Sequence, residues 1–411
     1  MFNLWIVVLK YWVLVWCIHG ASLPAVFGLS ISCSTTRRQF FKGASAFVPI
    51  LAGAESLIVP VSLASDLSDE SPSRDSITMS AASTTGRSNN VAYKTVTLNI
   101  PRYGVQIPVA CWFPTTASAQ SAVPFQPKPK YRHRISVRRI GELLAGWEFI
   151  PEFASKNFEF SPTLSSGGTL VNGERMSIPL GSQVVILSHG FLGSRFDLSH
   201  IAEDLAAKGF VCFSPEYPES LAASYQRVSG LDRETVNNAL LEYIETTVKP
   251  TAYGVVGHSL GCGTALRLGD ASWARVLIAG PPAPEDCPSP VLLITSTNDV
   301  FVRSSGRPLV LPSVYQRLQE NNLPAAIPRT SALIFDRPNG PNHISYLSEN
   351  VNDSMVSFLS PLLPLAQALS IPVLDFDTYQ KARDAKPTAA IIRPLISSFM
   401  VQQMASPIEV R

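Results

Sequence analysis

Residues 257–261 have the sequence Gly-His-Ser-Leu-Gly, in which a serine stands between two glycines. This spacing fits the pattern G-x-S-x-G. The apolar run before it predicts a buried strand, and the residues after it predict a helix. Glycines at such a strand-to-helix turn let the two elements pack closely, and the strained turn exposes the hydroxyl. The pattern predicts that Ser259 is a nucleophile, with a plain glycine-rich turn as the alternative.

A serine hydroxyl is a weak nucleophile at neutral pH and needs a neighbouring base. In proteins that carry this turn, the chain order is serine, acid and histidine. Of the six histidines, only His343 follows Ser259 in the sequence, in a loop after the predicted strand at 331–336. A loop there brings the imidazole over the edge of a sheet. We therefore predict that His343 is the base.

The base needs an acid that orients its ring and stabilises its charged form. Asp299 stands at the end of the predicted strand "PVLLITSTND" and is the candidate. Capping of the next turn is the alternative use for this carboxylate. Asp286 and Glu285, one strand earlier, are the runner-up acids.

A His-Gly pair follows the predicted strand in "VILSHGFLGS", residues 185–194. The loop after it can fold back over the serine, so that the backbone amides of Phe191 and Leu260 point at a developing oxyanion. We interpret His189 as a residue that packs this loop. We expect His258 to fill the turn, and His133 and His200 to lie on the surface or on helix faces.

From residue 182 onward, apolar strand-like runs alternate with helical patterns. This alternation predicts an α/β protein with a doubly wound, mostly parallel sheet and helices on both faces. The β-rich runs at 93–100 and 105–113 predict an antiparallel pair at its beginning. Apolar residues at helical spacing predict an amphipathic helix within 134–149.

The first part of the chain has the composition of a targeting sequence rather than of a folded domain. An apolar run at 2–18 resembles a signal-peptide core, and Arg37-Arg38 before a second apolar stretch resembles a twin-arginine signal. We expect export from the cytosol to a plastid, with the thylakoid lumen as one destination, or to the secretory pathway. An uncleaved membrane anchor is the further alternative.

Composition shifts along the chain predict four parts. We expect a targeting presequence, a disordered Ser/Thr-rich linker, a catalytic domain with a long insertion, and a C-terminal helical extension of unassigned function. Their predicted ranges are 1–64, 65–92, 93–363 with the insertion at 114–181, and 364–411.

The bulk composition excludes some classes of protein. The 411 residues include 33 Lys and Arg against 31 Asp and Glu, so no strong field draws the chain to nucleic acid. Its six cysteines form no CxxC pair and no metal-ligand spacing, so we expect no metal site. Cys111 and Cys212 lie in apolar runs, where a buried thiol is expected. We predict no catalytic cysteine.

Taken together, these motifs over residues 93 to about 363 resemble the α/β-hydrolase superfamily. Within it, "LSHGFLGSRFDLSHIAEDLAAKGFVCFSPEYPE" and "GHSLGCGTA" are most similar to platelet-activating-factor acetylhydrolases, lipases and chlorophyllase-like esterases. Cys262 departs from this group, which usually has glycine there. The resemblance implies a serine esterase that cleaves a carboxylic ester through an acyl-serine formed on Ser259, with His343 moving the proton and no cofactor.

The substrate expected from this resemblance is a small-molecule or lipid ester, with acyl lipids favoured. An aromatic-rich insertion beside the mouth of the site can form an acyl pocket, although core packing is the alternative; its aromatic residues are Trp147, Phe149, Phe153, Phe158 and Phe160. The arginines of the helix within 134–149 suit contact with a membrane surface. A chlorophyll or pheophytin phytyl-ester hydrolase and a catalytically silent binding protein of the same fold are the alternatives. The oligomeric state is not predicted.

Overall fold

The structure is a computed structural model in which the described residues are 90–115, 129–146, 150–151, 155–164, 169–299, 309–362, 364 and 382–405. The predicted presequence lies outside them, as does the predicted linker except for its last three residues. The first strand begins at Asn90, a little earlier than expected.

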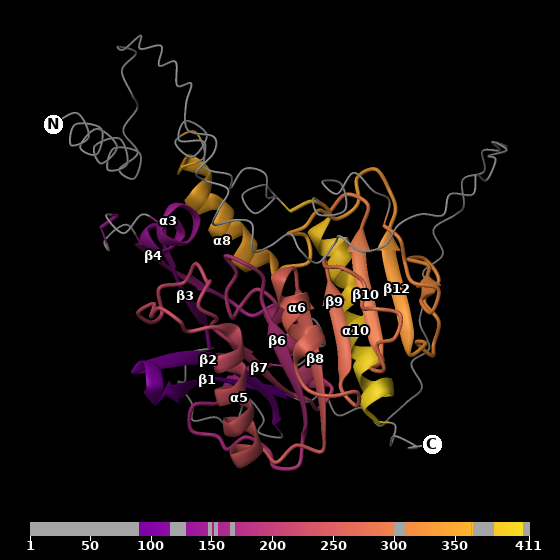
Figure 1. Ribbon diagram of the computed structural model, residues 1–411, viewed down its shortest axis with the longest axis horizontal. Helices are drawn as coiled ribbons and strands as arrows, with labels where there is room; N and C mark the ends of the chain where they lie inside the picture. The colour runs from indigo at the N-terminus through magenta and orange to yellow at the C-terminus, as the bar shows by residue number, and fades with distance from the viewer. Residues whose placement is uncertain are drawn as a thin grey trace, which may run out of the picture. The chain divides into compact units, whose positions relative to one another are not determined.

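Ten strands form one sheet in the order β11-β12-β10-β9-β8-β6-β7-β2-β1-β5, and Figure 1 shows its central strands side by side. Most are short runs of β-branched and apolar residues, buried on both faces as in a sheet covered by helices. Their bounds are β1 Asn90–Ile100, β2 Val105–Thr115, β5 Leu170–Asn172, β6 Gln183–Ser188, β7 Val211–Pro215, β8 Ala252–His258, β9 Ala274–Ile278, β10 Val291–Ser296, β11 Gln316–Leu318 and β12 Thr330–Phe335.

Strand β2 pairs antiparallel with both β1 and β7, and the other strand pairs of this sheet are parallel. This confirms the predicted mostly parallel sheet with an antiparallel pair at its start. The chain passes from β6 outward to β7 and then returns to β8 on the other side of β6. Such a reversal places the carboxyl ends of β6 and β8 around a crevice where ligands bind in open α/β sheets. The chain has the α/β-hydrolase fold.

Helices cover both faces of the sheet, and each face has its own hydrophobic core. α4 (Ser199–Ala207) and α10 (Ala385–Ala405) bury apolar side chains in one core. α5 (Arg233–Thr247) and α6 (Leu260–Arg267) do so in the other. The sheet is therefore enclosed, and its strand ends are left as the place for a site.

The described part of the insertion between residues 131 and 160 forms a small layer of its own, whereas β5 belongs to the main sheet. β3 (Tyr131–Ser136) and β4 (Ser155–Phe160) pair antiparallel as a separate two-stranded sheet. The predicted amphipathic helix is present as α3 (Val137–Ala145), where the Ser136 side chain accepts a hydrogen bond from the backbone N–H of Arg139 and caps the helix. Gly146 ends it in the left-handed conformation.

The last part of the chain contributes to the core of the fold. α8 (Glu349–Leu359) and the short helix η3 (Ser360–Leu362) are followed by α10, which packs against β8, β9, β10 and α4. Ile396 and Phe399 of α10 are fully buried. The predicted boundary at residue 363 therefore does not separate a packed domain from an appendage. Among the helices that the structure describes, none is long and apolar enough to cross a membrane.

His133 and His200 are both buried. His200 lies on helix α4, one of the two places expected for it, whereas His133 lies on strand β3, so the expected surface or helix-face position is wrong for His133. His133 lies on β3 with Tyr131 and Ile135 on the inward face, because side chains two residues apart share one face of a strand. Burial lowers the pKa of both imidazoles to about 3. Both rings are therefore neutral at physiological pH.

Candidate active site

Ser259 lies in the tight turn between β8 and α6 and has a positive φ of 54°. A positive φ is costly for a residue with a side chain, by about 1–3 kcal/mol. Two backbone hydrogen bonds offset part of that cost: the N–H of Ser259 donates to the carbonyl of Ile278 on β9 at 2.9 Å, and its carbonyl accepts from the N–H of Cys262 at 2.9 Å. The strained conformation holds the hydroxyl at the end of the sheet.

The two glycines of the turn are required by close backbone approach. A Cβ atom added to Gly257 would overlap the carbonyl group of Gly261, and one added to Gly261 would overlap the carbonyl of Ser188 at the end of β6. The start of α6 therefore lies directly against the ends of two strands. This contact explains the G-x-S-x-G spacing in steric terms.

The structure brings the three predicted catalytic side chains together. His343 Nε2 lies 2.9 Å from Ser259 Oγ, and His343 Nδ1 lies 3.0 Å from Asp299 Oδ2. With Asp299 ionised, the imidazole donates from Nδ1 to the carboxylate and accepts the serine hydroxyl proton at Nε2. Asp299 is fully buried and His343 nearly so, whereas Ser259 is partly exposed. A substrate can reach the hydroxyl, and the two partners are shielded from solvent.

The runner-up acids lie elsewhere. Asp286 and Glu285 are exposed in the loop after β9, and the Glu285 carboxylate accepts a hydrogen bond from the Ser313 hydroxyl. Asp299 is the acid that contacts His343.

His258 connects the turn to the loop that carries the base. Its Nε2 donates to the backbone carbonyl of His343 at 2.9 Å. Burial lowers the pKa of His258 to about 3, so this ring is neutral. His258 thus fixes the backbone of the residue that carries the base. This role is more specific than the expected one of filling space in the turn.

The loop after β6 lies against the nucleophile. A Cβ atom added to Gly190 would lie 3.1 Å from the Cβ of Ser259. Within the described residues, the backbone N–H groups of Phe191 and Leu260 donate no hydrogen bond to the protein. Leu260 is also the first residue of α6, where the amides are free and the helix dipole is positive. Both groups remain our predicted donors to an oxyanion.

His189 fixes the peptide group that contains the Phe191 N–H. Its Nε2 lies 3.1 Å from the backbone N–H of Tyr217, which makes Nε2 an acceptor. The proton is then on Nδ1, which lies 2.8 Å from the carbonyl of Gly190 and donates to it. Burial lowers the pKa of His189 well below its ordinary range, so the ring stays neutral.

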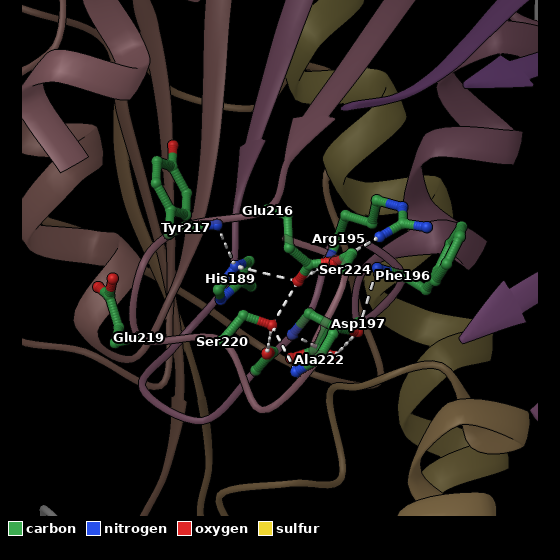
Figure 2. Close-up of polar contacts among 12 residues, drawn as sticks. His189, Arg195, Phe196, Asp197, Glu216, Tyr217, Glu219, Ser220, Ala222 and Ser224 are labelled. Carbon is green, nitrogen blue, oxygen red and sulfur yellow. Dashed lines mark hydrogen bonds and ion pairs between the residues drawn. The ribbon is translucent and has the colours of Figure 1, made fainter. Parts of the chain in front are cut away.

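A buried carboxylate, Glu216, holds the far end of this loop. The guanidinium of Arg195 donates to Glu216 Oε2 at 2.5 Å, and the backbone N–H of Arg195 donates to Oε1 at 3.3 Å. The Ser220 hydroxyl contacts the same carboxylate and the carbonyl of Gly193 at 2.8 Å. Figure 2 shows His189, Arg195 and Ser220 gathered around Glu216.

Asp197 closes the same loop on itself. Its Oδ1 accepts hydrogen bonds from the backbone N–H of Ser194 at 3.0 Å and from the Ser194 hydroxyl at 2.9 Å. Burial raises the pKa of Asp197 to about 7. The loop between β6 and α4 is therefore held by two buried carboxyl groups.

A third hydrophobic cluster includes a residue of the loop at 189–195, which we call the oxyanion loop. It joins Leu192 to the β3 and α3 region of the insertion and to the end of α8. Its buried members are Ile135, Ile140, Leu192, Leu221 and Leu359, with Leu143, Leu144, Phe158 and Phe358 packed against them. Phe191, next to Leu192, is 37% exposed. The loop that lies against the nucleophile is thus packed on apolar side chains at Leu192.

The expected acyl pocket is described only in part. Phe160 is buried and packs against Tyr131 and Phe196, so it belongs to the core. Phe158 is partly exposed in the third cluster. Trp147, Phe149 and Phe153 lie outside the described residues.

Three charged residues that hold the oxyanion loop were not predicted from the sequence. They are Glu216, its partner Arg195 within the loop, and Arg233, which donates to the carbonyl of His189. The position of Glu216 directly after β7 was an available signal, because a charged residue at the carboxyl end of a buried strand in this fold lies near the site. Arg195 and Arg233 carried no such signal in spacing or motif.

Comparison with known proteins gives structural likeness only. No protein-family model matches the chain, and no curated protein matches it. A ferulic acid esterase from Streptomyces cinnamoneus is similar at 18% identity, 80% coverage of this chain, 95% of that chain and a TM-score of 0.41. XC6422 from Xanthomonas campestris, a serine hydrolase without a lid, is similar at 11% identity, with coverages of 67% and 95% and a TM-score of 0.31.

A dienelactone hydrolase from Anabaena variabilis is similar at 14% identity, with coverages of 69% and 97% and a TM-score of 0.29. Likeness at this level does not define a reaction or a substrate. The fold assignment rests on the strand order of this chain, and the site rests on its own contacts.

Proposed function

We propose that this chain is a serine hydrolase that cleaves carboxylic esters of acyl lipids through an acyl-serine intermediate. The observation that carries the proposal is the contact of 2.9 Å between His343 Nε2 and Ser259 Oγ, with Asp299 on the other ring nitrogen. An alcohol, a base and an orienting acid in this arrangement perform nucleophilic acyl transfer.

The first half of the reaction forms the acyl-enzyme. Ser259 Oγ attacks the ester carbonyl carbon while His343 Nε2 takes the hydroxyl proton, and Asp299 stabilises the resulting imidazolium. The carbonyl oxygen becomes an oxyanion that the amides of Phe191 and Leu260 bind. The bond to the alcohol oxygen then breaks, and His343 gives its proton to the departing alcohol.

The second half uses water in place of the serine. His343 takes a proton from a water molecule, and the hydroxide formed attacks the acyl carbon. The bond to Ser259 Oγ breaks, and the proton returns from His343 to the serine. The products are a carboxylic acid and an alcohol, and no group is oxidised or reduced.

Cys262, the cysteine next to the nucleophile turn, is not suited to act as a competing nucleophile. Cys262 is fully buried behind Ser259, and its thiol lies 3.2 Å from each of two backbone carbonyls, those of Gly257 and Ile278. Burial raises the pKa of Cys262 to about 12. A thiol that stays protonated and enclosed does not act as a nucleophile.

The third hydrophobic cluster supports our proposal of an acyl lipid as the substrate. The third hydrophobic cluster begins at Leu192, and the exposed ring of Phe191 adds apolar surface next to the predicted oxyanion donors. Pockets for ligands of this kind are lined mainly by aliphatic and aromatic side chains.

A substrate panel tests the proposal. The wild-type protein and Ser259→Ala are assayed with p-nitrophenyl acetate, p-nitrophenyl palmitate, a diacyl phospholipid in vesicles and chlorophyll a. We expect hydrolysis by the wild type alone, with a higher kcat/KM for the long-chain esters than for the acetate.

Two other outcomes of the substrate panel would each contradict one part of the proposed function. Faster hydrolysis of chlorophyll a than of the lipid esters would assign the phytyl-ester alternative and remove acyl lipids. Absence of turnover on every ester would contradict the proposed enzyme and leave a silent binding protein of this fold.

A further inference from the structure

Arg233, the first residue of α5, reaches across to the start of the oxyanion loop. Its Nη2 donates to the backbone carbonyl of His189 at 2.8 Å and contacts that of Gly190 at 3.4 Å. Its Nη1 donates to the hydroxyls of Ser188 at 3.0 Å and Thr264 at 3.2 Å. One guanidinium thus joins the end of β6, the loop and helix α6.

The other side of this guanidinium is also occupied. Arg233 Nε forms an ion pair with Glu219, and the guanidinium carbon lies 4.2 Å from the ring centroid of Tyr217. These contacts fix the planar guanidinium of Arg233 in one orientation. The ammonium group of a lysine would not be held in this way, because it is not planar and its side chain is flexible. Glu219 lies in the segment after β7, so α5, the loop and this segment meet at Arg233.

The contact matters because of the peptide group that it touches. The carbonyl of Gly190 belongs to the same planar peptide as the N–H of Phe191, and in a trans peptide these two bonds point in opposite directions. His189 Nδ1, the N–H of Gly193 and Arg233 Nη2 all approach that carbonyl. Donors on the carbonyl side therefore fix the direction in which the Phe191 amide points.

Arg233 acts on this peptide through position more than through a long-range field. Glu219 balances its charge at short distance, so the attraction felt by a distant oxyanion is small. A charge-assisted hydrogen bond on the neighbouring carbonyl, in contrast, holds the peptide plane firmly and polarises it. A peptide held in advance needs no reorganisation when the oxyanion forms.

We infer that Arg233 is a positioning residue for the oxyanion hole, acting through the carbonyls of His189 and Gly190 on the Phe191 amide. This inference rests on the proposed function, because it assigns Phe191 as an oxyanion donor. Arg233 touches neither Ser259 nor His343 in the structure, so it is not a catalytic residue.

The chain offers a closely matched control in Arg393 of α10. Arg393 pairs with Asp204 of α4 at 2.6 Å, and the side chains of this pair are 11% and 15% exposed, against 11% and 17% for Arg233 and Glu219. The control pair joins two helices on the other face of the sheet. A loss of buried charge alone affects both sites alike.

The test compares Arg233→Met, Arg233→Lys and Arg393→Met in the full chain. Steady-state hydrolysis of p-nitrophenyl acetate gives kcat and KM, and titration with a fluorophosphonate gives the concentration of competent sites. We expect kcat per site to fall about 10-fold to 1,000-fold in Arg233→Met, with KM within about 2-fold. We expect Arg393→Met to keep kcat per site within about 2-fold of the wild type.

A second readout separates positioning from folding. Adding guanidinium at low, non-denaturing concentration to Arg233→Ala refills the vacated site, and we expect part of kcat to return. The same addition to Arg393→Ala leaves kcat unchanged.

Several results would overturn the inference. One is an unchanged kcat per site in Arg233→Met. Another is an equal loss in the Arg393 control. If Arg233→Met does not fold, Arg233→Lys decides, because it keeps the charge and loses the fork: we expect a loss of kcat of about 5-fold or more, and an unchanged kcat is contradictory. Failure of the proposed function gives a different pattern, since the wild type would then turn over no ester at all.

Discussion

The nucleophile turn at 257–261 and the oxyanion loop at 189–195 meet at one reacting centre, yet different interactions hold them. The turn is fixed by its own backbone: a positive φ at Ser259 and two glycines whose missing side chains let α6 contact the strand ends. The loop is fixed from outside by charged side chains, chiefly Glu216 and Arg233.

The two regions are therefore sensitive to different substitutions. A turn held by close backbone approach fails when a methyl group is added, because backbone atoms cannot move aside. A loop held by buried charges fails when one partner is removed, because the other charge is left unpaired in the interior. The same chemistry thus depends on shape at 257–261 and on charge pairing at 189–195.

On the side of the nucleophile, Asp299→Asn should produce the larger loss. An amide in place of the carboxylate favours the wrong imidazole tautomer and no longer stabilises the imidazolium, so kcat should fall about 100-fold to 10,000-fold. Thermal stability should change little, because the side chains are nearly equal in volume. Ester hydrolysis rates and melting temperatures check both points.

The matched control for this prediction is Asp286→Asn. This exposed runner-up acid should keep the wild-type rate. A loss in Asp286→Asn with none in Asp299→Asn would show that the acid has been misassigned.

At the contact between the two regions, Gly190→Ala should produce an intermediate loss. The new methyl group would lie 3.1 Å from Ser259 Cβ and 3.3 Å from His258 Nδ1, so the loop must shift away from the nucleophile. A displaced amide binds the oxyanion less well, and we expect kcat to fall about 10-fold to 100-fold. Single-turnover acylation rates measure this directly.

Gly263→Ala, on α6 close to the same turn, is its control. The added methyl group would approach only the Arg267 guanidinium, at 3.6 Å, and a helical alanine is favoured over glycine by about 1 kcal/mol. Activity should be kept and stability slightly raised. Equal losses in the two variants would contradict a specific role of the Gly190 contact.

On the side of the loop alone, Asp197→Asn should produce the smallest and most specific effect, on pH dependence. The pKa of Asp197, raised by burial to about 7, lies above the 3.8 of an unperturbed aspartate. Its contribution to stability is therefore full below pH 3.8 and is lost as the pH rises through about 7. Between pH 5 and pH 8 the wild type should lose more stability than the variant, by at most about 3 kcal/mol.

Urea unfolding at the two pH values measures that difference. The asparagine oxygen keeps the bonds from Ser194, so the fold should survive. Asp353→Asn, an exposed position on α8, should keep the wild-type pH dependence. Parallel pH profiles for the wild type and Asp197→Asn would exclude a buried protonated carboxyl group in this loop.

The sequence predicted the triad and the sheet because each depends on local patterns. Buried strands are visible as apolar runs, and their carboxyl ends meet at one edge, so Asp299 and His343 could be placed near Ser259 from chain order alone. The predicted antiparallel pair and parallel sheet follow from the same periodicities.

The supporting contacts could not be predicted in the same way. Glu216 and Arg195 are 21 residues apart and belong to no repeating pattern. The core packing of α10 was hidden for a local reason, since Pro394 inside this helix predicts an interruption. The burial of His133 was visible in principle, through its alternation with Tyr131 and Ile135, but the charged residues on either side, Arg132 and Arg134, favour an exposed position.

The most direct test of the account is site-specific labelling of the folded protein with a fluorophosphonate, followed by peptide mapping with mass spectrometry. We predict one phosphonyl adduct on the peptide that carries Ser259, absent in His343→Ala and unaffected by the control variant Arg393→Met. No adduct on the folded wild type, or an adduct on another residue with Ser259 unmodified, would contradict the claim that His343 and Asp299 activate Ser259.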